Sequence, residues 1–515
     1  MKLGKLLQKL DYHFEDMQGG IVTDPAVRAA LLDREITDIT NDSRKVSEGG
    51  LFFCIVGANS DGHDFARASL GSGAGAIVIQ HDVNLAGLDF PLDDPAACPA
   101  IIRVTDTRYA MAFIAAAWYG DPAKEMKIIG ITGTKGKTTT TYMIRSILEN
   151  AGIPTGLIGT IEIAYADKRI PAGNTTPESV VLQKTFRDMA DAGMKAVVME
   201  VSSQALMLHR TQGFLFDIGI FTNISPDHIG SNEHRDFEDY LSCKGLLFKQ
   251  CRVGILNGDD PNTQAVLDGH TCSVETFGLS KDNDLYADDL KLIHEPGELG
   301  ISFSTHGLIE MPVQVHLPGQ FSVYNALSAI AVCRHFGVGE EMIKDALKKI
   351  AVRGRIEMVP VPGGYTLLID YAHNAVALES ILTTLRAYEP SRLICLFGCG
   401  GNRSKLRRYE MGEVSGKFAD LTVITSDNPR FEDPLAIMED IKTGIAKTDG
   451  QHVDIPDRKE AIRFAMHEAR PGDIVVLAGK GHEDYQEICG VKHPMDERVL
   501  IAEILREDKE AKGTE

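Results

Sequence analysis

The sequence predicts a multidomain α/β protein built on parallel sheets. Runs rich in β-branched residues alternate with helical patterns, as in KIIGITG, KAVVMEVSS, YTLLIDYAHN and DLTVITSDNP. Strands that helices cover on both faces give such unbroken apolar runs, and strands separated by helices pair in parallel. The chain has 515 residues, of which 43% are hydrophobic. This length favours about three domains over one.

Loop-forming stretches divide the chain into its predicted domains. WYGDPAKEM is a predicted linker, and so is the stretch around VRGRIEMVPVPGG, because both combine Gly and Pro with charged residues. We therefore expect domains at residues 1–121, 122–352 and 353–515.

Charge and cysteine usage limit the partners and the compartment. The chain carries 53 Lys+Arg against 73 Asp+Glu, a formal net charge of -20, which disfavours binding to nucleic acid or to anionic membranes. Its 9 cysteines lack zinc-type spacing and are typical of free thiols in a reducing cytoplasm. No run approaches the roughly 18 apolar residues of a membrane span. We expect a cytoplasmic protein without membrane insertion.

The stretch GITGTKGKTTTT is close to the phosphate-loop pattern GxxxxGK[ST] from Gly130 to Thr138, with five residues instead of four between Gly130 and Gly136. It follows an apolar run and precedes a helical pattern, which is the order that the motif requires. Glycines let backbone N–H groups face phosphate, Lys137 adds a positive charge, and the Thr138 hydroxyl can hold Mg²⁺. The sequence therefore predicts a nucleoside triphosphate site whose residues are Gly133, Thr134, Lys135, Gly136, Lys137, Thr138 and Thr139.

Two further side chains lie where strands of the same region end. Glu200 ends the run KAVVME, and His228 follows FDIGIFTN. A carboxylate and an imidazole at adjacent strand ends can bind a metal ion directly or through water. Each of them, taken alone, is as readily explained as a capping or core polar residue.

Late in the chain, apolar runs end in the polar loops DYAHN, GCGGNR, SDNPR and GKGHE. Ligands of open α/β sheets bind outside the carboxyl ends of the strands, so these loops are expected to line one crevice. If the loop DNPR is considered by itself, Asn-Pro forms a turn and Arg430 is a solvated surface charge. Its position among the other loops favours a ligand-binding role.

These stretches occur in the order found in Mur ligases, and the chain resembles the MurE branch of that family. Further matching stretches are NTTPES, MEVSSQALMLHR, TNISPDH, SCKGLLF, HLPGQFSVYNALSA and GRIE. The region from NDSRKV to GAIVI is similar to the family's uridine-nucleotide-binding domain, so the resemblance covers nearly the whole chain. It implies a UDP-sugar-binding N-terminal domain, a central P-loop ATPase domain and a Rossmann-like C-terminal domain that binds an amino acid.

The resemblance implies an ATP-dependent ligase of peptidoglycan biosynthesis. ATP would phosphorylate the D-glutamate carboxylate of UDP-N-acetylmuramoyl-L-alanyl-D-glutamate, and an amino acid would attack the acyl phosphate. Lys137, Lys244 and His228 would be catalytic, with Mg²⁺ held by Thr138, Glu200, His228 and a carbamylated Lys244 (N6-carboxylysine). Asn325, Arg355, Asp370 and His373 would lie towards ATP. A monomer is expected.

Substrate-binding residues follow from the same resemblance. Ser43 and His63 would lie near the uridine diphosphate, although His63 also suits a local turn. Thr175, Thr176, Ser202 and Arg210 would bind the muramoyl peptide. DNPR is associated with meso-diaminopimelate, whose distal carboxylate a guanidinium can bind in a fork, whereas the bare ammonium of lysine would be repelled. Contacts to the amino acid would come from Arg403, Asn428, Arg430, Gly479 and Glu483, with Glu483 pairing the distal ammonium.

The chain departs from the family's usual pattern at several positions. They are Gln204, Leu208, Ser322, Arg353, Asn374 and Asn402, together with a longer stretch IGSNEHRDF after His228. The phosphate and metal residues are kept, so activity is the favoured interpretation, with altered substrate preference as the open question.

Three alternatives remain. Another ATP-dependent amide ligase, such as a folylpolyglutamate synthase or a cyanophycin-type ligase, would lack the uridine-type region at residues 42–79. A catalytically silent regulatory paralogue would release no phosphate with any amino acid. The same ligase chemistry with L-lysine or another amino acid is the third.

Overall fold

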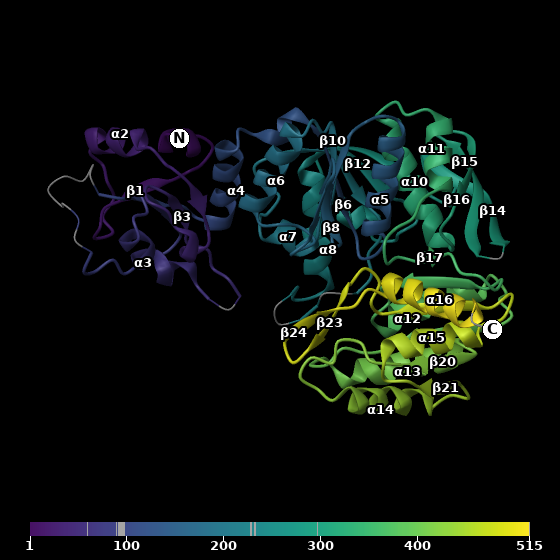
Figure 1. Cartoon of the computed structure of the whole chain (residues 1–515). Helices are drawn as coiled ribbons and strands as arrows, with labels where there is room; N and C mark the ends of the chain where they lie inside the picture. Colours follow the sequence, from purple (N-terminus) through teal and green to yellow (C-terminus); the bar gives the residue numbers. More distant parts are fainter. Residues whose placement is uncertain are drawn as a thin grey trace. The chain divides into compact units, whose positions relative to one another are not determined.

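The computed structural model describes residues 1–58, 60–88, 90, 98–226, 229–230, 233–295 and 297–513. The chain forms two compact units, one of residues Met1–Asp284 with Ser328–Val338 and one of residues Leu285–Leu327 with Gly339–Glu515. Figure 1 shows the helices and strands of the chain, coloured along the sequence. The three domain ranges predicted from the sequence stay a prediction. The described residues include no helix that is both long and apolar enough to cross a membrane.

The first unit begins with a small sheet of strand order β1-β5-β4-β3-β2. β1 pairs antiparallel with β5, and the remaining neighbours are parallel. Its strands are β1 (His13–Glu15), β2 (Ile39–Thr40), β3 (Leu51–Phe53), β4 (Ala76–Ile79) and β5 (Ala100–Arg103). Its helices are α1 (Leu3–Leu6), α2 (Pro25–Asp33), η1 (Ser43–Lys45), η2 (Gly62–Phe65), α3 (Ala66–Gly71) and α4 (Thr107–Trp118). α4 begins where the Asp106 carboxylate accepts a hydrogen bond from Tyr109 N at 2.8 Å.

The larger sheet of the first unit carries the phosphate-loop region. Within this unit its strands run in the order β13-β12-β11-β6-β10-β7-β8-β9, parallel from β13 to β7 and antiparallel beyond. The strands are β6 (Lys127–Thr132), β7 (Thr155–Ile158), β8 (Glu162–Tyr165), β9 (Lys168–Pro171), β10 (Ala196–Glu200), β11 (Phe216–Phe221), β12 (Cys251–Asn257) and β13 (Ser273–Gly278). The helices are η3 (Pro122–Glu125), α5 (Lys137–Asn150), α6 (Ser179–Asp191), α7 (Ser203–Met207), α8 (Phe237–Gly245), η4 (Leu246–Lys249) and α9 (Thr263–Val266). Leu182, Phe186 and Met189 bury one stripe of α6 against Val197 of β10.

The second unit contains an antiparallel meander and a six-stranded sheet. The meander is β14 (Leu285–Glu295), β15 (Glu298–Gly307) and β16 (Met311–Val315), followed by α10 (Gln320–Arg334) and α11 (Glu340–Lys348). The six-stranded sheet has the order β17-β18-β22-β19-β20-β21, and only β17 is antiparallel. Its strands are β17 (Glu357–Val359), β18 (Thr366–Asp370), β19 (Leu393–Phe397), β20 (Leu421–Ile424), β21 (Gln451–Asp454) and β22 (Ile474–Ala478). A hairpin of β23 (Tyr485–Ile488) and β24 (Val491–Pro494) follows.

Helices cover both faces of this six-stranded sheet. Leu368 and Val476 pack on α12 (Ala375–Arg386), α13 (Lys405–Phe418) and α14 (Pro434–Ile445). Leu367 and Val475, on the opposite face, pack on α15 (Arg458–Glu468) and α16 (Glu497–Gly513). Burial of alternate residues on two faces explains why the strands are apolar without interruption. The predicted α/β fold class is confirmed.

Parallel pairing sends the predicted ligand loops to one edge of the sheet. Asp370, the last residue of β18, pairs with Ala478, the last residue of β22. β19 and β20 are parallel to this pair and end at Phe397 and Ile424. The loops DYAHN, GCGGNR, SDNPR and GKGHE therefore all leave the carboxyl edge.

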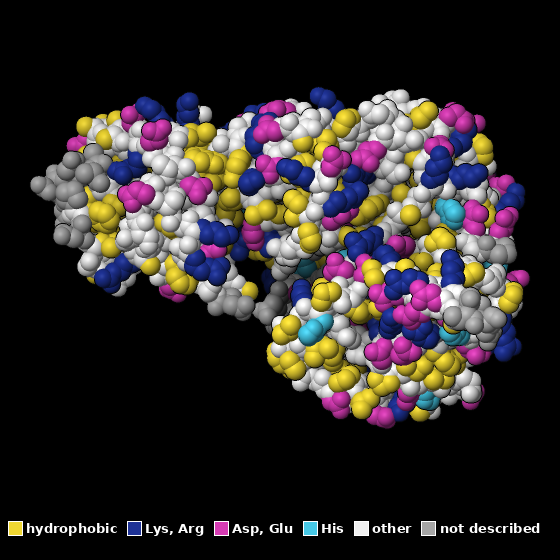
Figure 2. Space-filling model, in the orientation of Figure 1, with side chains coloured by type: hydrophobic (Ala, Val, Ile, Leu, Met, Phe, Trp, Pro, Cys, Tyr) yellow, Lys and Arg dark blue, Asp and Glu magenta, His cyan; other side chains and the backbone are white. Residues whose placement is uncertain are grey.

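On the face of the molecule in Figure 2, acidic and basic side chains are interspersed.

Candidate active site

The phosphate loop lies between β6 and α5, as the motif predicts. Gly133 and Gly136 have φ angles of 149° and 86°, which favour glycine. A Cβ on Gly133 would lie 1.9 Å from Thr222 Oγ1, so a side chain has no room there. Lys137 Nζ donates to the carbonyls of Gly133 at 2.7 Å and Thr134 at 3.1 Å. The lysine ammonium therefore lies over the loop that is expected to hold phosphate, at the positive end of α5.

Thr138 and Glu200 meet beside this loop. β10 is the neighbour of β6, and Glu200 pairs with Ile131 in the register. The Thr138 hydroxyl donates to Glu200 Oε1 at 3.0 Å, and Thr160 donates to the same carboxylate from its N at 2.9 Å and its Oγ1 at 3.0 Å. Glu200 is 1% exposed. A hydroxyl and a buried carboxylate are oxygen ligands of the kind that Mg²⁺ prefers, so the described residues fit that ion. His228 lies outside the described residues.

Lys244 is buried near the same loop and is not a surface lysine. It lies on α8 with 1% exposure, and its Nζ is 4.3 Å from the centroid of the Tyr240 ring. The Tyr240 hydroxyl is 3.1 Å from Thr134 Oγ1 in the phosphate loop. A lysine this deeply buried needs a specific partner or a chemical modification to offset the loss of hydration.

The residues expected to bind the muramoyl peptide gather around the end of β10. Thr176 Oγ1 donates to the carbonyl of Glu200 at 2.9 Å and accepts from Ser202 N at 3.1 Å. Thr175 Oγ1 is 3.0 Å from Thr160 Oγ1. Ser202 caps α7, because its hydroxyl accepts from Ala205 N at 3.1 Å.

Arg210 joins this group through an acidic partner that the sequence did not indicate. Its Nη2 lies 2.7 Å from Glu178 Oε1, and its Nη1 donates to the carbonyl of Thr176 at 3.1 Å. Glu178 also pairs with Arg108 of α4 at 3.1 Å. Glu178 lies in the stretch NTTPES, close in sequence to Thr175 and Thr176, and this closeness is the signal from which its role could have been predicted.

The two residues assigned to the uridine diphosphate come from separate turns of the small sheet. Ser43 is the first residue of η1 and is half-buried. His63 is 5% exposed, its Nδ1 is 2.6 Å from Asp61 Oδ1, and its Nε2 accepts from Gln80 N at 3.0 Å. Burial lowers the pKa of His63. Because both ring nitrogens have protein partners and the His81 ring stacks on it with 3.6 Å between centroids, the His63 ring supports its own turn.

The residues expected near ATP in the second unit surround Tyr371. The Arg355 guanidinium lies 4.8 Å from the centroid of the Tyr371 ring, and His373 Nδ1 is 2.9 Å from the Tyr371 carbonyl. Asp370 accepts from Ile356 N and from Ala372 N, each at 2.9 Å. Burial raises the pKa of Asp370 and lowers that of His373. Asn325 lies on α10 and is 5% exposed.

The predicted amino-acid residues meet at the carboxyl edge around a lysine that the sequence did not single out. Lys480 is fully buried, and its Nζ donates to Asn428 Oδ1 at 2.8 Å and to Glu483 Oε2 at 3.0 Å. Asn428 Nδ2 donates to the same oxygen of Glu483 at 2.9 Å. Lys480 thus neutralises Glu483 and orients its carboxylate. Gly479, with φ of 106°, begins this loop.

Arg430 and Arg403 lie across the neighbouring loop. Arg430 pairs with Glu487 at 3.1 Å and donates to the carbonyl of Gly401 at 2.7 Å. A Cβ on Gly400 would lie 3.3 Å from Arg430 Nη1 and 3.9 Å from Arg403 Cγ, so glycine leaves room for both side chains. Glu487 was also missed, although it follows the GKGHE loop in the stretch YQEI.

Family models match most of the chain. The model described as "Mur ligase family, catalytic domain" matches residues 35–119, "Mur ligase middle domain" matches 131–333, and "Mur ligase, glutamate ligase domain" matches 354–481. A UDP-N-acetylmuramoyl-L-alanyl-D-glutamate--2,6-diaminopimelate ligase 1 of Clostridium acetobutylicum is 43% identical over 479 residues, which are 92% of this chain and 96% of that protein. The chain belongs to the Mur ligase family. The predicted family and its architecture are confirmed.

Other Mur ligases and a more distant synthase extend the comparison. The Clostridium botulinum protein named UDP-N-acetylmuramoyl-L-alanyl-D-glutamate--2,6-diaminopimelate ligase is 41% identical and covers 92% of this Mur ligase and 96% of its own length. A solved structure of a ligase with that name superposes with a TM-score of 0.69 at 29% identity, over 93% of this chain and 96% of the other. A Mycobacterium tuberculosis folylpolyglutamate synthase has a TM-score of 0.57 and covers 72% of this chain and 91% of its own. At 18% identity it shares the fold only.

Four departures of this Mur ligase from the usual pattern have local structural roles. Asn402 adopts a φ of 54°, which asparagine tolerates well, and its Oδ1 accepts from Phe431 N at 3.2 Å. Asn374 caps α12 by accepting from Ala377 N at 2.9 Å, and Arg353 donates to Asp496 at 2.9 Å. The Ser322 hydroxyl donates to the carbonyl of Pro318 at 2.9 Å. Gln204 is exposed and Leu208 half-buried.

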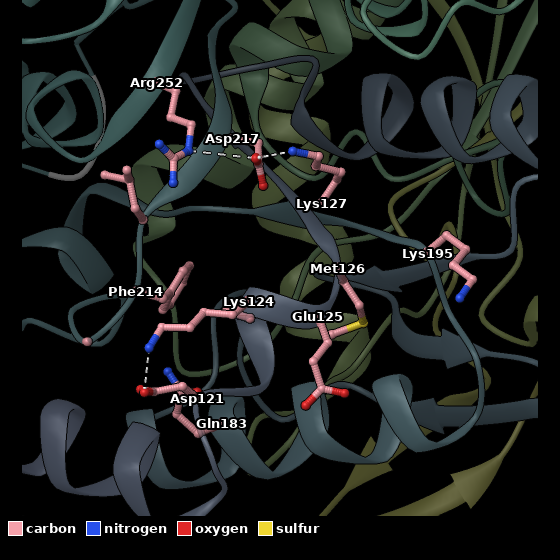
Figure 3. Close-up of a pocket in the computed structure, with 13 residues that line it drawn as sticks. Asp121, Lys124, Glu125, Met126, Lys127, Gln183, Lys195, Phe214, Asp217 and Arg252 are labelled. Carbon is pink, nitrogen blue, oxygen red and sulfur yellow. Dashed lines mark hydrogen bonds and ion pairs between the residues drawn. The ribbon is translucent and has the colours of Figure 1, made fainter.

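This Mur ligase also has a cavity in its first unit, and Figure 3 shows residues that line it. The cavity of about 420 Å³ lies where β6, β10, β11 and β12 begin. Asp217 pairs there with Lys127 at 2.9 Å and with Arg252 at 3.8 Å, and Asp121 pairs with Lys124 at 2.7 Å. Because most of its charges neutralise each other, the cavity offers no clear complement to an anionic substrate.

Proposed function

We propose that this Mur ligase adds meso-diaminopimelate to UDP-N-acetylmuramoyl-L-alanyl-D-glutamate at the expense of ATP, in peptidoglycan biosynthesis. The observation that carries the proposal is its 43% identity, over 92% of its length, to a ligase named for that reaction. The second support is chemical: the phosphate loop and the buried Thr138–Glu200 pair suit ATP with Mg²⁺, and the loops around Arg430 carry charges of both signs.

The reaction requires two bonds to form in sequence. A D-glutamate carboxylate oxygen attacks the γ-phosphorus, and the bond from that phosphorus to ADP breaks. The amine then attacks the acyl carbon and loses a proton. The bond from the acyl carbon to the bridging oxygen breaks, and inorganic phosphate leaves with that oxygen, which came from the carboxylate. Lys137 and the amino end of α5 are proposed to hold the phosphates during both steps. Gly133, Thr134, Lys135, Gly136 and Thr139 complete this loop.

Oxygen ligands would hold Mg²⁺ beside this loop. Thr138 and Glu200 are the proposed ligands among the described residues, with His228 and an N6-carboxylysine at Lys244 as the others. Bound Mg²⁺ would screen the charge of the transferring phosphoryl group. Burial of Lys244 supports the modification, since a carbamate replaces an ammonium by a group that can bind the ion. Carbon-13 NMR under labelled bicarbonate should show a carbamate signal that Lys244→Arg lacks.

Substrate contacts are proposed for the remaining predicted residues. Thr175, Thr176, Ser202 and Arg210 would bind the muramoyl peptide, since they gather at the end of β10 next to Glu200. Ser43 and His63 would lie near the uridine nucleotide. Asn325, Arg355, Asp370 and His373 would contact ATP. Arg403, Asn428, Arg430, Gly479 and Glu483 would bind the amino acid. A cytoplasmic monomer is proposed as the working form, and light scattering of the purified protein tests the monomer.

An amino-acid panel tests the function. The purified protein is incubated with ATP, Mg²⁺ and the nucleotide dipeptide, and phosphate release is measured with meso-diaminopimelate, L-lysine and other amino acids. Release that depends on meso-diaminopimelate supports the proposal. Release with L-lysine alone favours the lysine alternative, and no release with any amino acid favours a silent paralogue.

A further inference from the structure

The guanidinium of Arg430 is only partly available for a ligand. Nε donates to Glu487 Oε2 at 3.1 Å, and Nη1 donates to the carbonyl of Gly401 at 2.7 Å. The side chains of Arg430 and Glu487 are each 24% exposed. Within the described part of the chain, Nη2 has no protein partner. The edge of the guanidinium that carries Nη2 is therefore the one left for a substrate carboxylate.

The chain fixes Glu487 beside Arg430 through the backbone. Glu487 N donates to Asn428 Oδ1 at 2.9 Å, and its carbonyl accepts from Arg430 N at 3.0 Å. One residue further on, Ile488 forms a bridge with Arg430, and Cys489 N donates to the Arg430 carbonyl at 2.7 Å. The hairpin β23–β24 thus places a carboxylate next to the arginine.

This carboxylate changes the charge that the site presents. Six of the charged side chains on these loops are Arg403, Arg430 and Lys480 on the positive side, and Asp427, Glu483 and Glu487 on the negative side. The set is formally neutral with Glu487 and positive without it. With Glu487 beside it, Arg430 repels a lone ammonium less than an unpaired arginine would, because the partner carboxylate cancels most of the field of Arg430.

We propose that Glu487 is an internal counter-ion of Arg430 that sets how strongly the enzyme prefers a diamino acid with a distal carboxylate over one with a bare distal ammonium. The inference rests on the proposed function. Glu487 competes with the distal carboxylate of meso-diaminopimelate for the guanidinium, and it reduces the repulsion between Arg430 and the ammonium of L-lysine. It therefore narrows the difference in kcat/KM between meso-diaminopimelate and L-lysine.

Glu487→Gln separates the charge from the geometry. The glutamine amide oxygen can still accept from Arg430 Nε, and the Gly401 carbonyl and the backbone bonds still hold the arginine. We expect the ratio of kcat/KM for meso-diaminopimelate to that for L-lysine to rise about tenfold, with little change in the KM for ATP. Asp484→Asn removes a carboxylate from the preceding turn and serves as the matched control, with an expected change in the ratio of less than about twofold.

A double-variant cycle identifies the partner. In an Arg430→Gln background, Glu487→Gln should raise the ratio clearly less than it does beside Arg430, since the guanidinium that it would release is absent. If Glu487→Gln folds poorly, Glu487→Asp, whose carboxylate falls short of Nε, should raise the ratio less but in the same direction. A ratio that is unchanged or lower in a folded, active Glu487 variant overturns the inference. Lack of ligase activity in the unmodified protein would instead count against the proposed function.

Discussion

Thr138 of α5 and Glu200 of β10 share a hydrogen bond of 3.0 Å at a buried point beside the phosphate loop. Glu200→Gln keeps the shape but removes the charge from this point. We expect kcat to fall about 100-fold or more, with a higher Mg²⁺ concentration needed for half-maximal activity. Phosphate release measured across a Mg²⁺ titration gives both numbers. Thr160→Val, which deletes only one donor to Glu200, is the matched control and should change kcat by less than about tenfold.

Arg430→Ala should raise the KM for meso-diaminopimelate far more than the KM for ATP. Loss of a partly buried charge contact is expected to cost about 2 to 4 kcal/mol of binding free energy for the amino acid. Initial rates with each substrate varied in turn provide the comparison. Equal increases in both KM values would place Arg430 outside the amino-acid site.

The pH dependence of stability should reflect His482. Burial, and then the charge of Arg355, lower the pKa of His482 from 6.5 to about 4, and its Nδ1 is buried without a hydrogen-bond partner in the described residues. As the pH falls below about 6.5, the unfolded chain takes up a proton that the folded chain does not accept until about pH 4. The free energy of unfolding should therefore decrease as the pH falls from about 6.5 to about 4. At pH 8 the ring is neutral in both states, so its titration makes no contribution.

Urea unfolding of the protein and of His482→Gln at pH 7.5 and 5.0 measures this contribution. The unmodified protein should lose up to about 2 kcal/mol more than the variant on acidification. The same loss in both proteins would show that His482 titrates normally in the folded state.

Gly354→Ala should strongly destabilise the second unit. Gly354 has a φ of 68°, and an added Cβ would lie 2.1 Å from His482 N and 2.3 Å from Gly481 C, which are backbone atoms that cannot move aside cheaply. We expect a loss of about 3 kcal/mol or more. Gly297 lies in the same unit and has a φ of 78° with no atom within 4 Å of an added Cβ, so Gly297→Ala should cost only about 1 kcal/mol. Thermal unfolding of both variants compares the clash with the backbone strain alone.

The sequence carried the fold class and much of the site because both are local patterns. Unbroken apolar runs predicted doubly covered strands, and the order of strand, glycine loop and helix predicted the phosphate loop. Because the late strands pair in parallel, the loops that follow them must lie at the same edge of the sheet. The position of Glu200 at the end of β10 also followed from an apolar run, KAVVME.

The residues that the sequence did not indicate act through pairings between distant positions. Lys480 and Glu487 matter because they contact Glu483, Asn428 and Arg430 across two loops. A single sequence does not reveal such partners. Similarly, the sequence offered two explanations for His63, and only the contacts of its ring nitrogens with Asp61 and Gln80 favour the local turn.

The most direct test of the proposed reaction follows an oxygen atom. The nucleotide dipeptide is prepared with ¹⁸O in the reacting D-glutamate carboxylate and is incubated with ATP, Mg²⁺ and meso-diaminopimelate. We expect a UDP-linked tripeptide and inorganic phosphate that carries one ¹⁸O atom, because the attacking oxygen leaves with the phosphate. Unlabelled phosphate, or ATP hydrolysis without a tripeptide product, would contradict the proposed reaction.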